Sequence, residues 1–153
     1  MPLFSRIPID KRVVETAIQH LERQTSAELR VYIERMIPNV AANCYDEAGV
    51  KRAFELFEQL EMNKTAQHNA VLIYLAYKHH FCWIIGDEGI HRHVGDAFWQ
   101  SVYDEMLFFF KKDQYTQGLV RAIECIGKEL KRHYPIDSND KDELPNEVII
   151  NDS

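Results

Sequence analysis

The stretch AVLIYLAYKHHFCWIIG, residues 70–86, decides the fold of this chain. It holds two runs of branched and aromatic residues, 70–77 and 81–86, a composition typical of β-strands. The first run is continuously apolar, so we expect a central strand that is covered on both faces. Only the tripeptide KHH (78–80) separates the runs, which is the length of a hairpin loop. The stretch therefore predicts two neighbouring antiparallel strands.

A further strand and two helices are predicted upstream of this hairpin. Residues 29–34 alternate apolar and polar side chains, the period of a strand with one better-buried face. Apolar residues recur at helical spacing in 10–26, where Asp10 is a plausible N-cap, and in 46–61. Because a helix lies between them, strands 29–34 and 70–77 are expected to be parallel and joined by a right-handed crossover.

Two more amphipathic helices, 96–112 and 115–134, follow the hairpin, and Pro135 stops the second. Helices before, between and after strands predict the α/β class, as a three-layer α/β/α sandwich with a small mixed central sheet and helices on both faces. We expect one domain over residues 1–135. Residues 136–153 are acidic, polar and short of core residues, and we expect them to form a flexible tail.

Composition excludes some classes of function. The chain has 153 residues, of which 46% are hydrophobic, and a formal net charge of −6. No basic stripe with interleaved aromatic residues is present, so we expect no nucleic-acid partner. The apolar runs are far shorter than the ~20 residues that span a bilayer. No secretory signal is recognisable at the start, and a cytoplasmic location is the default expectation.

The carboxylates that follow the hairpin are the first candidate site. Gly86 is followed at once by Asp87 and Glu88. Because strand 81–86 runs opposite to the other two, its end lies where they begin, and those beginnings carry Glu28 and Asn69. The four side chains of Glu28, Asn69, Asp87 and Glu88 are thus expected at one edge of the sheet. Such hard oxygen ligands suit Ca²⁺ or Mg²⁺ better than zinc.

Other interpretations of these acids stay open at this point. Neighbouring like charges repel unless something neutralises them, which a bound cation, Arg92 or Lys64 could do. Asp87 could be a helix cap, because acidic residues favour the first turn of a helix. Glu28 could be a solvated residue at the strand edge. Spacing alone does not choose between a cation site and these structural roles.

Several motifs resemble the TPM-domain family when they are taken in order. These are TSAELRV (25–31), FELFEQLEMNKTAQHNAVLIYLA (54–76), IIGDEGIHRHVGDAFWQSV (84–102), QGLVRAIECIGKEL (117–130) and DELPNEV (142–148). The resemblance covers residues 10–135, and the tail resembles the soluble bacterial branch. It implies an α/β/α sandwich, divalent-cation binding near the acidic loop in several members, and the phosphatase activity reported for a plant thylakoid-lumen member.

Carried over by motif, the matching positions are Glu28 in TSAEL, Asn69 in HNAVLI, and Asp87 with Glu88 in GDEGI. The family commonly has Arg-Asn-Gly where this chain has His68-Asn69-Ala70, so a fixed cation is missing here. Three hypotheses follow: a Ca²⁺ or Mg²⁺ binding module, a metal-assisted phosphoester hydrolase, or a protein that docks a partner during stress or membrane-protein repair. No catalytic residue is assigned.

Overall fold

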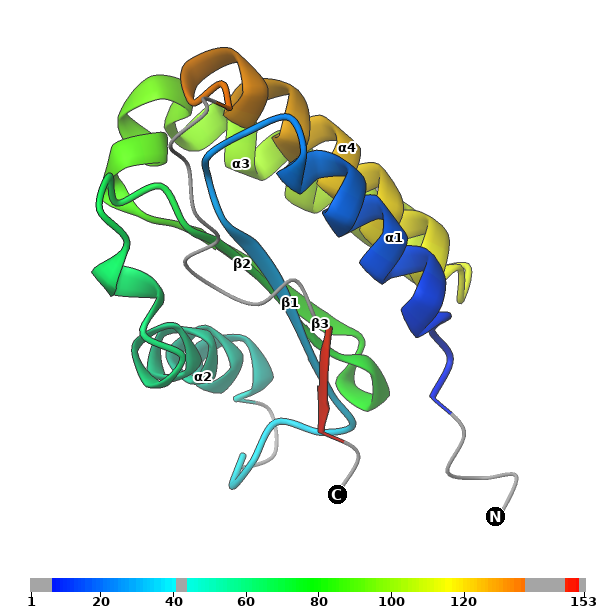
Figure 1. Cartoon of the computed structure of the whole chain (residues 1–153). Coiled ribbons are helices and arrows are strands. Elements are labelled where there is room, and N and C mark those ends of the chain that lie inside the picture. The colour runs from blue at the N-terminus through cyan, green and yellow to red at the C-terminus, as the bar shows by residue number, and fades with distance from the viewer. Residues whose placement is uncertain (1–6, 41–43, 137–147, 152–153) are drawn as a thin grey trace.

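The computed structural model describes residues 7–40, 44–136 and 148–151 (Figure 1). In these ranges four strands form one mixed sheet, and four helices cover its faces. The helices are α1 (Lys11–Glu22), α2 (Tyr45–Gln59), α3 (Glu88–Phe110) and α4 (Tyr115–His133), and the strands are β1 (Leu29–Glu34), β2 (Val71–Ala76), β3 (Phe81–Gly86) and β4 (Ile149–Asn151). Two short 3-10 turns, Met62–Lys64 and Tyr77–His79, connect them.

The sheet has the strand order β3-β2-β1-β4. β1 pairs in parallel with β2, and β3 returns antiparallel to β2 after the turn at Tyr77–His79. The predicted parallel crossover and the predicted hairpin are therefore both confirmed. Their registers align Leu29 with Val71 and Val71 with Gly86, so the starts of β1 and β2 and the end of β3 share one edge of the sheet.

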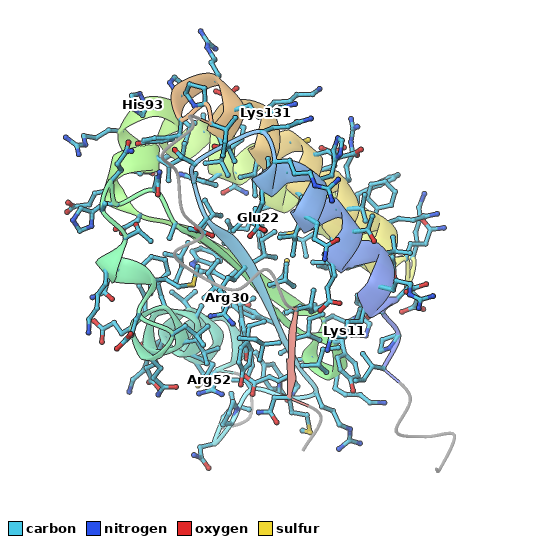
Figure 2. All side chains as sticks on the ribbon, in the orientation of Figure 1. Lys11, Glu22, Arg30, Arg52, His93 and Lys131 are labelled. Carbon is cyan, nitrogen blue, oxygen red and sulfur yellow. The ribbon has the colours of Figure 1, made fainter. Side chains whose placement is uncertain are left out.

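Helices cover both faces of this sheet, which confirms the predicted three-layer arrangement (Figure 1). α1, α3 and α4 pack on the face that carries Val31 and Ile73, while α2 packs on the face that carries Leu72 and Tyr74. Figure 2 shows Arg52 on the α2 side of the molecule, away from α1. None of the helices in the described ranges has the length and apolar character needed to cross a membrane.

β1 differs from the expected strand with one better-buried face, because all six of its residues are buried. Its polar positions Arg30 and Glu34 are 7% and 2% exposed. The reason is that α2 covers the face that the alternating pattern assigned to the polar side chains. Polar groups at such positions must find partners, since an unpaired buried charge is strongly destabilising.

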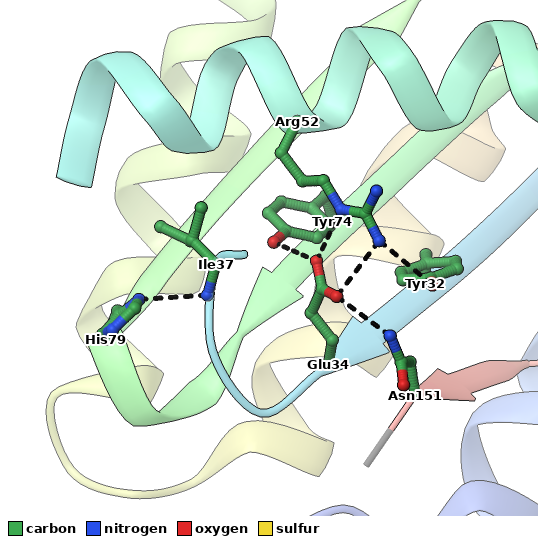
Figure 3. Close-up of polar contacts among 7 residues, drawn as sticks. All are labelled: Tyr32, Glu34, Ile37, Arg52, Tyr74, His79 and Asn151. Carbon is green, nitrogen blue, oxygen red and sulfur yellow. Dashed lines mark hydrogen bonds and ion pairs between the residues drawn. The ribbon is translucent and has the colours of Figure 1, made fainter. Parts of the chain in front are cut away.

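The carboxylate of Glu34 finds these partners on three other elements (Figure 3). It accepts hydrogen bonds from Arg52 Nε at 2.9 Å, from the Tyr74 hydroxyl, and from Asn151 Nδ2 at 3.1 Å. Burial and the hydrogen bond to Glu34 raise the pKa of Tyr74, so the phenol stays protonated as a donor. The hydrogen bond to Glu34 raises the pKa of Arg52 as well. Glu34 therefore joins α2, β2 and β4 through one compensated charge.

β4 is a strand that the sequence analysis missed, since it lies in the segment 136–153 that was expected to be a flexible tail. Ile149–Asn151 pairs in parallel with β1. Val148 is only 1% exposed, and its amide donates to Glu15 Oε2 at 2.9 Å. Three residues are too short for a periodic signal, and the pairing depends on contacts with Glu15 and Glu34 that are remote in sequence. Residues 137–147 and 152–153 lie outside the described ranges.

Truncation of Val148 tests whether β4 is a stable part of the fold. We expect Val148→Ala to lower the free energy of unfolding by about 2 kcal/mol, because it removes buried methyl groups and leaves a cavity. The control is Ile136→Ala, whose side chain is 47% exposed and which should change little. Urea denaturation measures both variants. An unchanged midpoint for Val148→Ala would support the flexible tail instead.

Removal of the guanidinium beside Glu34 tests the buried charge. Glu34 is 2% exposed and Arg52 is 18% exposed, so Arg52→Met leaves a buried carboxylate with fewer donors. We expect a loss of about 2–4 kcal/mol in the free energy of unfolding. Lys64→Met is the matched control, because the Lys64–Glu61 pair is 67% and 66% exposed and should contribute less than about 0.5 kcal/mol. Equal losses in the two variants would contradict this role of Glu34.

Candidate functional site

The edge where β1 and β2 begin and β3 ends brings the predicted acidic segments together. The amide of Val71 donates to the Glu28 carbonyl at 2.9 Å, and the amide of Asp87 donates to the Ala70 carbonyl at 2.9 Å. The backbones of Glu28, Ala70 and Asp87 therefore form one row across three neighbouring chain segments, with Asn69 next to the middle one. We call this edge, with residues 65–70 and the start of α3, the acidic rim.

Asp87 caps α3, which begins at Glu88 and not at residue 96 as the sequence analysis expected. Its Oδ1 accepts the amide of Glu88 at 2.8 Å. Gly95 lies just before the predicted helix 96–112, and its φ of 76° and ψ of 173° interrupt the helical backbone of α3. Asp87 therefore acts as a helix cap, which was one of the alternatives left open. Capping uses only one of its two carboxylate oxygens.

The side chain that pairs with Asp87 is His68, which is not among the predicted ligands. Nδ1 of His68 lies 3.3 Å from Asp87 Oδ2, and the His68 side chain is 55% exposed. Of the two side chains considered earlier, Lys64 pairs with Glu61 at 3.2 Å, and Arg92 Nε donates to the Glu88 carbonyl at 3.4 Å. Asp87 Oδ2 is therefore paired with an exposed imidazole that a ligand could displace.

Two oxygen atoms in the loop before β2 are buried without a hydrogen-bond partner among the described residues. They are Asn69 Oδ1 and Thr65 Oγ1, in side chains of residues that are 2% and 3% exposed. Buried polar atoms in folded proteins are nearly always satisfied, so an unsatisfied acceptor needs an explanation. A bound water molecule or ion is a usual one. The loop before β2 therefore carries two buried oxygen atoms that no described residue satisfies.

The predicted acids differ in burial. Glu28 is only 3% exposed, so the alternative that it is a solvated residue at the strand edge is wrong. Glu88, by contrast, is exposed. Glu28 and Asp87 stand on either side of β2, about 10 Å apart at two strand spacings. Within the described ranges no three His, Cys, Asp or Glu side chains form a group that could hold a metal ion. A cation here would need the amide, hydroxyl or carbonyl oxygens, or water.

A sequence profile of the TPM domain matches residues 7–129 of this chain. The chain belongs to the TPM-domain family. The family resemblance inferred from the motifs is therefore confirmed, together with the fold that it implied.

Two solved structures are similar to this TPM domain. The NMR structure of BA42 protein from the psychrophilic bacterium Bizionia argentinensis is 34% identical with a TM-score of 0.77, over 92% of this chain and 91% of that chain. The N-terminal domain of cg2496 protein from Corynebacterium glutamicum has a TM-score of 0.56 at 11% identity, over 88% of this chain and 76% of that chain, and shows the fold alone. No curated protein matches the chain.

Gly89 fixes the contact between the loop and α3 in this TPM domain. Its amide donates to the His68 carbonyl at 2.7 Å. A Cβ at this position would lie 2.2 Å from the Gln67 carbonyl oxygen and 2.5 Å from that of His68. The glycine in GDEG therefore permits a close approach of two backbones, which the sequence alone did not explain.

Substitution of Gly89 by alanine tests this packing. In a helix, Gly→Ala is usually stabilising by up to about 1 kcal/mol. Here we expect the opposite sign, a loss of about 1–3 kcal/mol in the free energy of unfolding, because the carbonyl groups of Gln67 and His68 must move. Thermal denaturation and amide chemical shifts of residues 65–70 measure the effect. A variant more stable than wild type would contradict the close approach.

Proposed function

We propose that this TPM domain binds a divalent cation, Ca²⁺ or Mg²⁺, at the acidic rim. The observation that carries the proposal is the buried, unpartnered Oδ1 of Asn69, one residue before the carbonyl group that accepts the Asp87 amide. An amide oxygen and a carboxylate are hard ligands of the kind that both ions prefer. A cation also accounts for an acceptor whose burial is otherwise unfavourable.

The ligands proposed are the side chains of Asn69 and Asp87, with Glu88 bound directly or through water. Glu28 stands on the other side of β2 and would act through water or by its charge. Mg²⁺ keeps several of its waters and Ca²⁺ tolerates six to eight oxygen ligands, so a site with two carboxylates is sufficient for either. The partial positive charge at the start of α3, about half an elementary charge, is smaller than the charge of the two carboxylates.

Calorimetric titration with CaCl₂ and with MgCl₂ tests the proposal. We expect wild-type protein to show saturable binding, and Asp87→Asn to bind at least about tenfold more weakly, a loss of about 1.4 kcal/mol. Asparagine is the sharper substitution because it still caps a helix but lacks the charge. Glu124→Gln, an exposed carboxylate on α4, is the matched control and should bind as wild type does.

Absence of binding by the wild-type protein at millimolar metal would contradict the proposal, as would equal binding by Asp87→Asn. Asn69→Ala leaves the net charge unchanged. Weaker binding by this variant would therefore show that the ion binds at the rim and is not held by the general negative charge of the surface. Amide chemical shifts that move at residues 65–70 and 86–89 upon titration would locate the ion at the rim.

Metal-assisted phosphoester hydrolysis is a second hypothesis that depends on the same ion. A bound cation would polarise a phosphoryl oxygen or activate water. The side chain paired with Asp87 is the imidazole of His68, in the place where the family commonly has a guanidinium. Since only Arg offers a bidentate fork for phosphate, the support for hydrolysis is the family resemblance, and cation binding is the proposal that the geometry favours.

A further inference from the structure

β3 lies at the edge of the sheet, and no strand pairs with its outer side among the described residues. The amide of Asp87 points inward, to the Ala70 carbonyl on the β2 side. Amide groups alternate in direction along an antiparallel strand. The backbone amides of Cys82, Ile84 and Gly86 therefore point outward, away from β2. Cys82 is 0% exposed and the Trp99 indole lies against Gly86, so side chains cover this edge and protect it from an added strand.

An apolar groove runs along this outer edge. One cavity of about 410 Å³ lies between β3, α2 and α3, and a second of about 310 Å³ extends toward the acidic rim. The two cavities share Phe54, Ile85, Gly86 and His91, so we treat them as one surface, the β3 groove. Its aromatic residues are Phe54, Phe57, Trp83, Trp99 and Tyr103. Phe54 is 53% exposed, so its ring is available for contact with a ligand.

Carboxylates line the β3 groove, together with the imidazole of His91. Its carboxylates are Glu58, Asp87, Glu88 and Asp96, and no Lys or Arg of the described chain lines either cavity. The chain has 18 Lys and Arg residues, so their absence from the described lining is informative. The Asp96 side chain is 99% exposed, and its Oδ1 lies 3.6 Å from Nε2 of His91, so its other oxygen is open to a partner. A groove of this kind complements a positively charged ligand with apolar side chains.

We propose that the β3 groove binds an extended, basic segment of a partner protein through the side chains of that segment. Alternate side chains would contact the aromatic residues, and a Lys or Arg would lie by Asp96, where Trp99 can also bind a cation over its ring.

The two tryptophans of the chain, Trp83 and Trp99, both line the groove, so intrinsic fluorescence reports its occupancy. The probe is the blocked peptide VKVKVKV, titrated in metal-free buffer so that the result is independent of the cation proposal. We expect a saturable change in emission and amide shifts at residues 81–86. The matched peptides are VEVEVEV, which tests charge, and GKGKGKG, which tests the apolar contacts. Both are expected to bind much more weakly.

Two variants place the peptide. Asp96→Lys reverses an exposed charge and should weaken binding by about three- to tenfold, whereas Glu124→Lys on α4 should not. Phe54→Ala removes a groove side chain that is 53% exposed and should weaken binding, whereas Phe108→Ala, at a 55% exposed position outside both cavities, should not.

Several results would overturn the proposal. One is an absence of any response to millimolar VKVKVKV, and another is equal binding of VEVEVEV or of GKGKGKG. A third is a dimer of this chain, detected by sedimentation and lost in Phe54→Ala, since the groove would then hold a second copy and not a basic segment.

Discussion

The antiparallel register of β3 on β2 is the constraint on which both proposed sites depend. Pairing of Val71 with Gly86 brings Asp87 to the edge where β1 and β2 begin. The same pairing leaves the outer side of β3 without a neighbouring strand in the described chain. A slip by one residue would turn every side chain of β3 to the other face. It would exchange buried Ile85 with its neighbours and move Asp87 away from Ala70, so the core and the rim are fixed by one set of contacts.

Much of this fold could be predicted from local patterns, because local physics determines those parts. The run 70–77 is apolar throughout and becomes the central strand β2, and Asp10 caps α1 by accepting the Val13 amide as its position suggested. β4 could not be found this way, because a three-residue strand is held by remote partners. The start of α3 was placed too late because the glycine at position 95 suggests a boundary, whereas the helix has already begun at Glu88 and resumes after this kink.

In the candidate site, the positions of the main-chain segments could be predicted from the sequence, but the partners of the side chains could not. Strand directions follow from connection lengths, so the meeting of the segments of Glu28, Asn69 and Asp87 could be predicted. Which side chain pairs with Asp87 depends on a turn in which His68 has a φ of 50°, and no local pattern indicates that conformation. The unpaired oxygen of Asn69 is likewise invisible in the sequence, where an asparagine in a polar connection indicates only a turn.

The acidic rim and the β3 groove share Asp87 and Glu88, so occupation of one should alter the affinity of the other. A divalent cation at the rim would neutralise the carboxylates at one end of the groove, while Asp96 at the other end would keep its charge. Binding linkage is reciprocal, so a cation that weakens a basic segment must itself be weakened by the same factor. The size of this coupling indicates where the basic side chain lies. A large antagonism places it near Glu88, and independence places it near Asp96, beyond one Debye length or screened by solvent.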